Sequence, residues 1–545
     1  MQKWRYALAS ALALALAGPV GSPATAATPK DTLVMAWNLD ALITFDPAQI
    51  AEINGNDIIR NVCDPLVEYK LDDVSKIVPK TAESWSVSED GLKLTFKLRP
   101  NLQFPSGKKA TAHDLAWSMH RVLHLGFGAS ANLTQWGFSK DKAEQQIVAT
   151  DDHTLVAHLD KPYPLQLILS AAFANQVTQL LDKEEGMKNA KVADGKSDHG
   201  NAFFKTAPIC VGPYKVRTWN ANDVVILERN DNYYGYDAYA GGKPALRRIV
   251  YRHVPESGAQ RLQIEKGDID VARLLNSDDL KALSSNKDVH IEQTLMHGFT
   301  YLVFNAADPI LSNPKVRLAF RYLIDYEGLG KTVIQYLGAP RNSLVPIGAY
   351  AALNEKEGLP FKLDLDKAKQ ILAEAGYPQG FSKKYILSAN TPNPPIAQHI
   401  AANAAKIGVK LELEQMADAH LFQRARNREF DVLQIGWGAG YPDADSMISR
   451  HAVNPDNRAE AKLAQYPSWR SSWQDQKVNQ WAEAAKMERD PAKRIAMYAD
   501  IQRYMLENGP MAYIYQTVRS IAIRKDVVKD FQIGPFWVAY GTAKK

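Results

Sequence analysis

Short apolar runs alternate with longer amphipathic segments along most of the chain. The runs 32–37, 248–251 and 385–387 contain β-branched or aromatic residues and have the length of buried strands. The segments 365–376 and 395–407 repeat apolar residues at the spacing of one helix face. Strands that alternate with helices in this way predict an α/β fold.

Two other segments predict local structure in more detail. Residues 82–87 and 92–98 alternate apolar and polar positions on either side of the turn 88–91, which is typical of a β-hairpin. Thr111 precedes a helical pattern, and Asp114 stands three residues after it. We therefore expect a helix that begins with a capping box and runs to about residue 125.

The N-terminus has the pattern of a secretory signal peptide. Lys3 and Arg5 precede an apolar run over 6–17 that is too short to span a bilayer, and Ala-Thr-Ala at 24–26 supplies a small-residue cleavage site. We expect residues 1–26 to be removed. No cysteine follows the apolar run, so we expect an exported protein without a lipid anchor.

Length and charge limit the function classes. The formal net charge is +5, and the expected signal peptide carries two of these charges, so the mature chain has +3. This small excess gives no argument for a nucleic-acid partner or an anionic membrane surface. About 520 residues remain, more than one hydrophobic core usually serves, so we expect two large lobes or three domains.

The stretch 430–445 is the strongest candidate for a binding surface. A short apolar run, 432–435, is followed by three glycines interleaved with Trp437, and then by Tyr441. Glycines let a ligand approach the backbone closely, while the rings offer flat apolar area with a polar edge. A tight turn with two core aromatic residues would show the same pattern, so the stretch alone leaves both interpretations open.

Motifs that would indicate an enzyme are incomplete. His120 and His124 have helical zinc-ligand spacing, but the glutamate of HExxH is absent. Residues 195–200 do not form a GxSxG nucleophile elbow, and 436–440 lack the spacing of a dinucleotide-binding loop. We expect no enzymatic activity, no cofactor and no metal site.

The segment 82–123, AESWSVSEDGLKLTFKLRPNLQFPSGKKATAHDLAWSMHRVL, resembles the signature region of the family 5 extracellular solute-binding proteins, the dipeptide, oligopeptide and nickel receptors of ABC importers. Seven further motifs resemble family landmarks in the family's order: VGPY at 211–214, NDNYYG at 230–235, GDID at 267–270, FN at 304–305, NPKVRLA at 313–319, DKAKQIL at 366–372 and AGYP at 375–378. Eight motifs in register make chance convergence implausible.

The resemblance implies a two-lobed periplasmic binding protein that encloses its ligand between α/β lobes. By analogy, two chain crossings are expected near 296–304 and 510–516. Lobe 1 would comprise 27–295 and 516–545, with a subdomain at about 72–204, and lobe 2 would comprise 296–515. The implied role is capture of a peptide or peptide-like solute in the periplasm, by a monomer that delivers it to an ABC permease in the inner membrane.

The resemblance also implies ligand contacts, and here the chain departs from its peptide-binding relatives. Their ammonium-anchoring aspartate, three positions after the tryptophan that matches Trp437, is replaced by Gly440. Their carboxylate-binding arginines fall in segments where this chain offers Asn390 and Gln434. A buried ligand charge without a partner costs on the order of several kcal/mol, so other charged residues must substitute or the ligand differs. The candidate substitutes are Asp443, Asp445, Glu52 and Arg424.

The complete set of candidate ligand residues is Glu52, Asn54, Trp136, Asn390, Arg424, Gln434, Trp437, Gly438, Ala439, Gly440, Tyr441 and Asp443. Oligopeptides held by backbone bonds, stacked oligosaccharides, opine-like conjugates and metal chelates stay open as ligands. We place peptides first because peptide uptake is the commonest activity in the family. A periplasmic chaperone or signalling receptor is the alternative outside transport.

Cys63 and Cys210 are the two cysteines of the chain. Both lie in segments that resemble elements of the first lobe near its core. In an exported protein this suggests a disulfide between them, and two buried unpaired thiols are the alternative.

Overall fold

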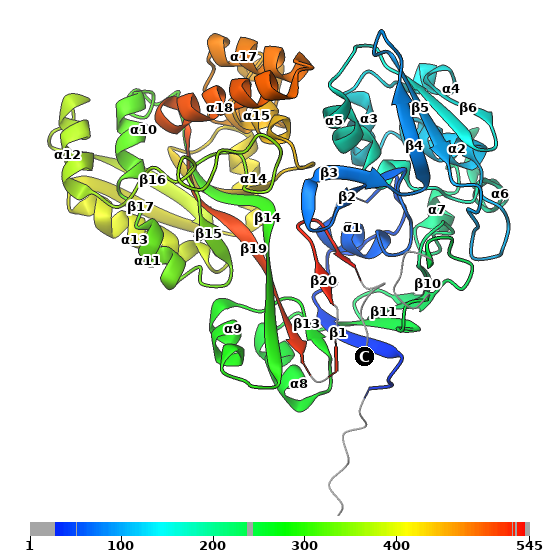
Figure 1. Ribbon diagram of the computed structural model, residues 1–545. Coiled ribbons are helices and arrows are strands. Elements are labelled where there is room, and N and C mark those ends of the chain that lie inside the picture. Colours follow the sequence, from blue (N-terminus) through cyan, green and yellow to red (C-terminus); the bar gives the residue numbers. More distant parts are fainter. Residues whose placement is uncertain (1–27, 51, 237–242, 526, 529–530, 540–545) are drawn as a thin grey trace, which may run out of the picture.

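The computed structural model describes residues 28–50, 52–236, 243–525, 527–528 and 531–539, so the expected signal peptide at 1–26 lies outside it. Two α/β bodies stand on either side of a pair of long strands, β14 (Val289–Phe304) and β19 (Met511–Arg524) (Figure 1). The predicted α/β class is confirmed.

One mixed sheet connects the two bodies. Its strand order is β10-β11-β12-β1-β13-β19-β14-β18-β16-β17, with β15 paired to β19. In the first body these strands are β1 (Thr32–Trp37), β10 (Tyr214–Asn220), β11 (Val224–Arg229), β12 (Arg248–His253) and β13 (Val271–Ala272). In the second they are β15 (Gly338–Pro340), β16 (Phe381–Ser388), β17 (Val409–Met416) and β18 (Val432–Gly438). The runs at 32–37, 248–251 and 385–387 are therefore strands, as predicted.

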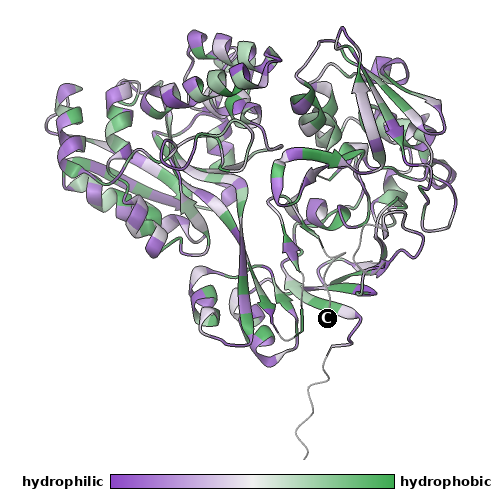
Figure 2. Cartoon of the chain, in the orientation of Figure 1, coloured by the Kyte–Doolittle hydropathy of each residue, from purple (hydrophilic) through white to green (hydrophobic). Residues whose placement is uncertain are grey.

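Helices cover both faces of the sheet in the second body. They are α10 (Pro314–Arg321), α11 (Tyr326–Lys331), α12 (Leu365–Glu374), α13 (Asn393–Ala405), α14 (Asp418–Arg426), α15 (Ala444–His451), α16 (Pro467–Arg470), α17 (Gln476–Met487) and α18 (Pro491–Asn508). Successive side chains of a strand point to opposite faces. Leu302 and Phe304 accordingly pack with α10, α12 and α13, while Tyr301 and Val303 pack with α15, α17 and α18. Hydrophilic residues dominate the outward helix surfaces (Figure 2).

The first body carries α1 (Ile53–Ile59), the hairpin β2 (Val67–Lys70) and β3 (Asp73–Pro79), and the helices α8 (Ser257–Lys266) and α9 (Ser277–Ser284). A separate four-stranded sheet of order β4-β5-β7-β6 forms its subdomain. The subdomain strands are β4 (Ala82–Val87), β5 (Lys93–Leu98), β6 (Ile147–Asp151) and β7 (Thr154–His158). Its helices and the short hairpin near them are α2 (Ala112–Leu125), α3 (Ala131–Thr134), α4 (Ala143–Gln146), α5 (Leu165–Ile168), α6 (Lys183–Lys188), β8 (Val192–Ala193), β9 (Lys196–Ser197) and α7 (Asn201–Phe204). A last hairpin, β20 (Gln532–Ile533) and β21 (Val538–Ala539), follows β19.

The predicted local structure of the subdomain is confirmed. β4 and β5 pair antiparallel around the predicted turn. The Thr111 side chain accepts a hydrogen bond from the Asp114 backbone, and the Asp114 carboxylate accepts one from the Thr111 backbone, which is the expected capping box.

The pairing of the long strands shifts register twice near the middle, between Leu295 and Phe299 and between Thr300 and Tyr301 of β14, and the first of these interruptions is the wider. Residues 289–295 of β14 pair with 524–518 of β19, and pairing resumes at Phe299 opposite Gln516. Three residues of β14, at 296–298, thus stand opposite Thr517 alone. Such a bulge bends a strand and turns its side chains away from the regular alternation. The expected lobe boundary at 295/296 coincides with the start of this interruption, whereas the one at 515/516 lies between two paired residues of β19; the division into lobes at these positions stays a prediction.

Cys63 and Cys210 form a disulfide, with their Cα atoms 5.2 Å apart and 147 positions between them in sequence. Cys63 follows α1, and Cys210 precedes β10. Both are buried, so the bond lies inside the core of the first body and closes a chain loop that contains the whole subdomain.

Replacing both cysteines, as Cys63→Ala with Cys210→Ala, should lower the free energy of unfolding by about 3–5 kcal/mol, because a crosslink of this span restricts the unfolded chain. Denaturant unfolding without reductant measures the difference, and wild type unfolded with reductant provides the matched control. Equal stability of wild type and double variant would contradict the prediction. So would two titratable thiols in unreduced wild type.

Candidate ligand-binding cavity

A cavity of about 590 Å³ lies at the interruption of the strand pair. Both bodies contribute to it: α1 and a segment before β21 come from the first, β18 and the loop after it come from the second, and β14 and β19 form its floor. The lining residues are Asn56, Met296, His297, Gly298, Phe299, Thr300, Gly436, Trp437, Gly438, Ala439, Gly440, Thr517, Arg519, Pro535 and Phe536.

The wall from β18 exposes backbone and one large ring. Gly436 and Gly438 pair with Thr300 and Gly298 of β14, and Trp437 stands between them. The indole lies edge-on to His451 at 5.5 Å between ring centroids, and the Arg470 guanidinium lies 5.4 Å from it. These contacts hold Trp437 half-buried, with its remaining surface on the cavity. A solute here meets a fixed aromatic ring beside glycine backbone.

His297 lies in the interruption of β14 and is 4% exposed. Its backbone oxygen accepts a hydrogen bond from Ala439 at 2.6 Å, and its ring lies edge-on to Phe536 at 5.1 Å. Neither ring nitrogen has a hydrogen-bond partner among the described residues. Burial lowers the pKa of His297 to about 3, so the ring is neutral near pH 7.

Arg519 is the charged residue among the described residues that line the cavity. Its guanidinium lies 3.2 Å from the carboxylate of Asp57, which also accepts hydrogen bonds of 2.9 and 2.8 Å from Arg273. Arg519 donates a further bond of 3.1 Å to the Gly534 carbonyl. All three charged groups are buried, so this cluster fixes α1 to β19 and to the residue that follows β13.

Comparison with known proteins identifies the family. The model of bacterial extracellular solute-binding proteins, family 5 Middle, matches residues 76–458. The chain belongs to family 5 of the bacterial extracellular solute-binding proteins. It is 27% identical over 534 residues to the probable D,D-dipeptide-binding periplasmic protein DdpA of Escherichia coli (strain K12), covering 96% of this chain and 95% of the relative.

Two further proteins are similar to this chain over most of its length. Heme-binding protein A of Haemophilus influenzae (strain ATCC 51907 / DSM 11121 / KW20 / Rd) is 27% identical over 428 residues, 75% of each chain. The structure of HbpA2 from Haemophilus parasuis superposes with a TM-score of 0.76 at 24% identity, covering 94% of this chain and 99% of that one. The predicted two-lobed architecture of periplasmic binding proteins is confirmed.

Four of the predicted ligand residues line the cavity: Trp437, Gly438, Ala439 and Gly440. Asn56, His297, Thr517 and Arg519 also line it and were not predicted. A lone histidine or arginine within a strand carries no motif, so the sequence offers little signal for these four. The expected crossing at 296–304 was the one indication, because it includes His297.

Asp443 is not among the residues that line the cavity, and its assignment as a replacement ammonium anchor stays a prediction. It caps α15 by accepting a hydrogen bond from Asp445, and both carboxylate oxygens accept bonds of 2.8 Å from Arg494. Burial alone would lower the pKa of Arg494, but the neighbouring Asp443 carboxylate outweighs it and raises that pKa above its ordinary value. Asp445 is also occupied, since it accepts hydrogen bonds from Tyr441 and Tyr498.

Tyr441 and Trp136 pack against each other, 6.3 Å between centroids, instead of lining the cavity. Trp136 comes from the subdomain and is 1% exposed, and the Lys486 ammonium of α17 lies 4.7 Å from its ring. Arg450 of α15 and Gln135 add a hydrogen bond of 3.4 Å beside them. These residues form a contact between the lobes, away from the cavity.

The remaining predicted residues also fall outside the cavity lining. Gln434 is completely buried, where its side chain bonds Tyr385 and Asn393 inside lobe 2. Asn390 bonds Asp418, and Arg424 forms an ion pair with Glu414 on the surface. Asn54 donates to the Asn38 carbonyl, and Glu52 stands at the N-cap position of α1. The side chains of Gln434, Asn390, Arg424 and Asn54 are thus hydrogen-bonded within the protein, and the ligand assignment of these residues and of Glu52 stays a prediction.

The histidines weighed as zinc ligands have other contacts. His120 lies 2.7 Å from the Ile147 carbonyl, and His124 lies 2.8 Å from Glu144. Within the described ranges, no group of three or more histidine, cysteine, aspartate or glutamate side chains could hold a metal ion. No helix among the described residues is both long and apolar enough to cross a membrane.

Asp443→Asn should lower the free energy of unfolding by about 3–5 kcal/mol, because it leaves the Arg494 guanidinium buried without its counter-ion. Denaturant unfolding measures this loss. Asp500→Asn is the matched control: Asp500 also pairs with an arginine, Arg503, but on an exposed helix face, and its replacement should change stability little. If Asp443→Asn keeps wild-type stability and instead abolishes solute binding, Asp443 is a ligand anchor after all.

Proposed function

We propose that the protein is the periplasmic solute-binding component of an ABC importer, and that it captures a peptide or peptide-like solute in the cavity between its lobes. The observation that carries the proposal is the position of this cavity, at the interruption of the strand pair and with walls from both lobes. The whole-length similarity to the D,D-dipeptide-binding protein of Escherichia coli supports a peptide ligand.

The chemistry of the walls suits a peptide held without an ammonium anchor. Trp437, Phe299 and Phe536 offer apolar rings, and the glycines around Trp437 allow close approach to backbone groups. Arg519 is the charged residue among the described lining residues. We infer that backbone hydrogen bonds and apolar burial dominate binding, so that side chains of different kinds can be accepted.

The protein captures its solute by a movement of the two lobes relative to each other, and no covalent bond forms. A solute that contacts both walls stabilises the closed form only as far as it binds that form better than the open one. The interruption at 296–298 is the place where the long strands can bend, because regular pairing is lost there. The closed, loaded form would then be the one that the membrane permease recognises.

Mass spectrometry of the small molecules released by denaturing the gently purified protein tests the function. We expect masses of short peptides or peptide-like conjugates in amounts near one per chain. A sugar, porphyrin or metal chelate at that amount would contradict the peptide class. Release of a chemically altered solute over time would contradict a purely binding role.

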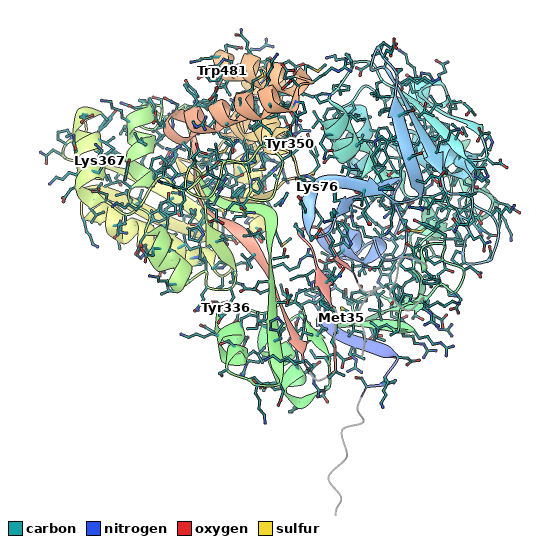
Figure 3. The ribbon with its side chains drawn as sticks, viewed as in Figure 1. Met35, Lys76, Tyr336, Tyr350, Lys367 and Trp481 are labelled. Atoms are coloured by element: carbon teal, nitrogen blue, oxygen red, sulfur yellow. A yellow bond between two sulfur atoms is a disulfide. The ribbon has the colours of Figure 1, made fainter. Side chains whose placement is uncertain are left out.

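Trp437→Ala should weaken binding of the released solute by about 1–3 kcal/mol, because apolar burial and stacking are lost whatever the ligand class. Calorimetry measures the loss. Trp481→Ala is the matched control, since this tryptophan belongs to α17 at the top of lobe 2 (Figure 3) and contacts Tyr504 instead of the cavity. Equal affinity of Trp437→Ala and wild type would remove Trp437 from the site.

A further inference from the structure

Two residues that line the cavity carry buried polar atoms without a hydrogen-bond partner among the described residues. These atoms are both ring nitrogens of His297 and Oδ1 of Asn56. Buried polar groups in folded proteins are nearly always paired, so groups left unpaired on a cavity wall require an explanation. A bound molecule that supplies the missing partners explains both.

The geometry of β14 places His297 there. His297 lies in the interruption at 296–298, and the residue borders both the main cavity and a neighbouring one of about 370 Å³. Gly348 lies close to the ring, since a Cβ atom at that position would be 3.3 Å from Nε2. Glycine at 348 thus leaves space for the imidazole. Asn56, in α1 of lobe 1, lines the same main cavity.

The hydrogen-bonding capacity of the two side chains selects one chemical class. Because burial keeps the imidazole neutral, it has one N–H donor and one acceptor nitrogen, and Asn56 Oδ1 adds a second acceptor. A carboxylate offers only acceptors and would leave both acceptors unmatched. An ammonium offers only donors and would leave the imidazole N–H unmatched. A primary amide, or two successive peptide groups, offers a carbonyl acceptor and two N–H donors, which together match all three groups. A single hydroxyl offers one donor and leaves one acceptor unmatched.

We propose that His297 and Asn56 form a polar subsite that recognises an uncharged amide group of the bound solute. The proposal rests on the proposed function, because it places the solute in the cavity between the lobes. The charged residues that line the two cavities bordering His297 are Arg519, Asp72 and Asp73. A charged end of the solute would lie toward these groups, and the amide would lie at the hinge.

Two variants of His297 separate recognition from structure. His297→Gln keeps a neutral donor and acceptor, whereas His297→Phe keeps the ring and removes both. We expect His297→Gln to bind within about threefold of wild type and His297→Phe to lose about tenfold or more, since the solute amide is then buried unpaired. The empty His297→Phe protein should melt at or above the wild-type temperature, because an unpaired buried polar ring has been replaced by an apolar one.

The probes are L-alanyl-L-alanine, D-alanyl-D-alanine, tri-L-alanine and the solute fraction released from wild-type protein by denaturation. Calorimetry gives the affinities, and His290→Gln, an exposed position on the same strand, is the control that should bind like wild type. Asn56→Ala should lose about tenfold. Calorimetry in two buffers of different ionisation enthalpy should show equal proton uptake for wild type and His297→Gln, since an amide leaves the ring neutral.

The outcomes are distinct. If wild type binds none of the probes, the proposed function fails and the subsite fails with it. If wild type binds and His297→Phe binds equally well, the subsite alone is refuted. If the empty His297→Phe protein melts at a lower temperature than empty wild type, the imidazole ring has a structural role. If wild type takes up a proton that His297→Gln does not, the group at the hinge is a carboxylate and the assignment to an amide is wrong.

Discussion

The antiparallel pairing of β14 with β19 is the interaction on which the other features depend. These two strands belong to the sheets of both lobes, so the lobes share one hydrogen-bonded framework. A continuous ladder would hold the lobes rigidly. The three residues opposite Thr517 interrupt it, and the interruption provides in one place a flexible point, a cavity floor and a histidine that lines the cavity.

The buried charged side chains near this strand pair are mostly paired inside one lobe or the other. Asp443 and Arg494 neutralise each other inside lobe 2, and Asp57 is shared by Arg273 and Arg519 inside lobe 1. Buried ions of this kind are costly to leave unpaired, so they fix α15 and α1 in position. The cavity between them carries mainly neutral groups. We infer that the rigid walls are held by ion pairs, while recognition depends on aromatic rings, backbone and neutral polar side chains.

Periodicity in the sequence identified the strands, the hairpin after residue 81 and the capping box at Thr111, because each depends on neighbouring residues alone. The glycine-rich stretch around Trp437 was identified for a related reason, since strand, glycines and ring are contiguous. The internal partners of Asp443 and Gln434 could not be predicted, because Arg494 and Tyr385 lie about fifty positions away in sequence. His297 was missed because its exposure to the cavity arises from a register break between strands more than two hundred residues apart in sequence.

A crystal structure of the protein with its co-purified solute tests the account most directly. The account predicts density for the solute at the interruption of β14, in contact with the Trp437 indole and within hydrogen-bonding distance of the His297 ring and Asn56 Oδ1. Solute density elsewhere would contradict it, for example beside Asp443 or Arg424. An occupied cavity in which the His297 ring nitrogens remain unpaired would contradict the role of the hinge in recognition.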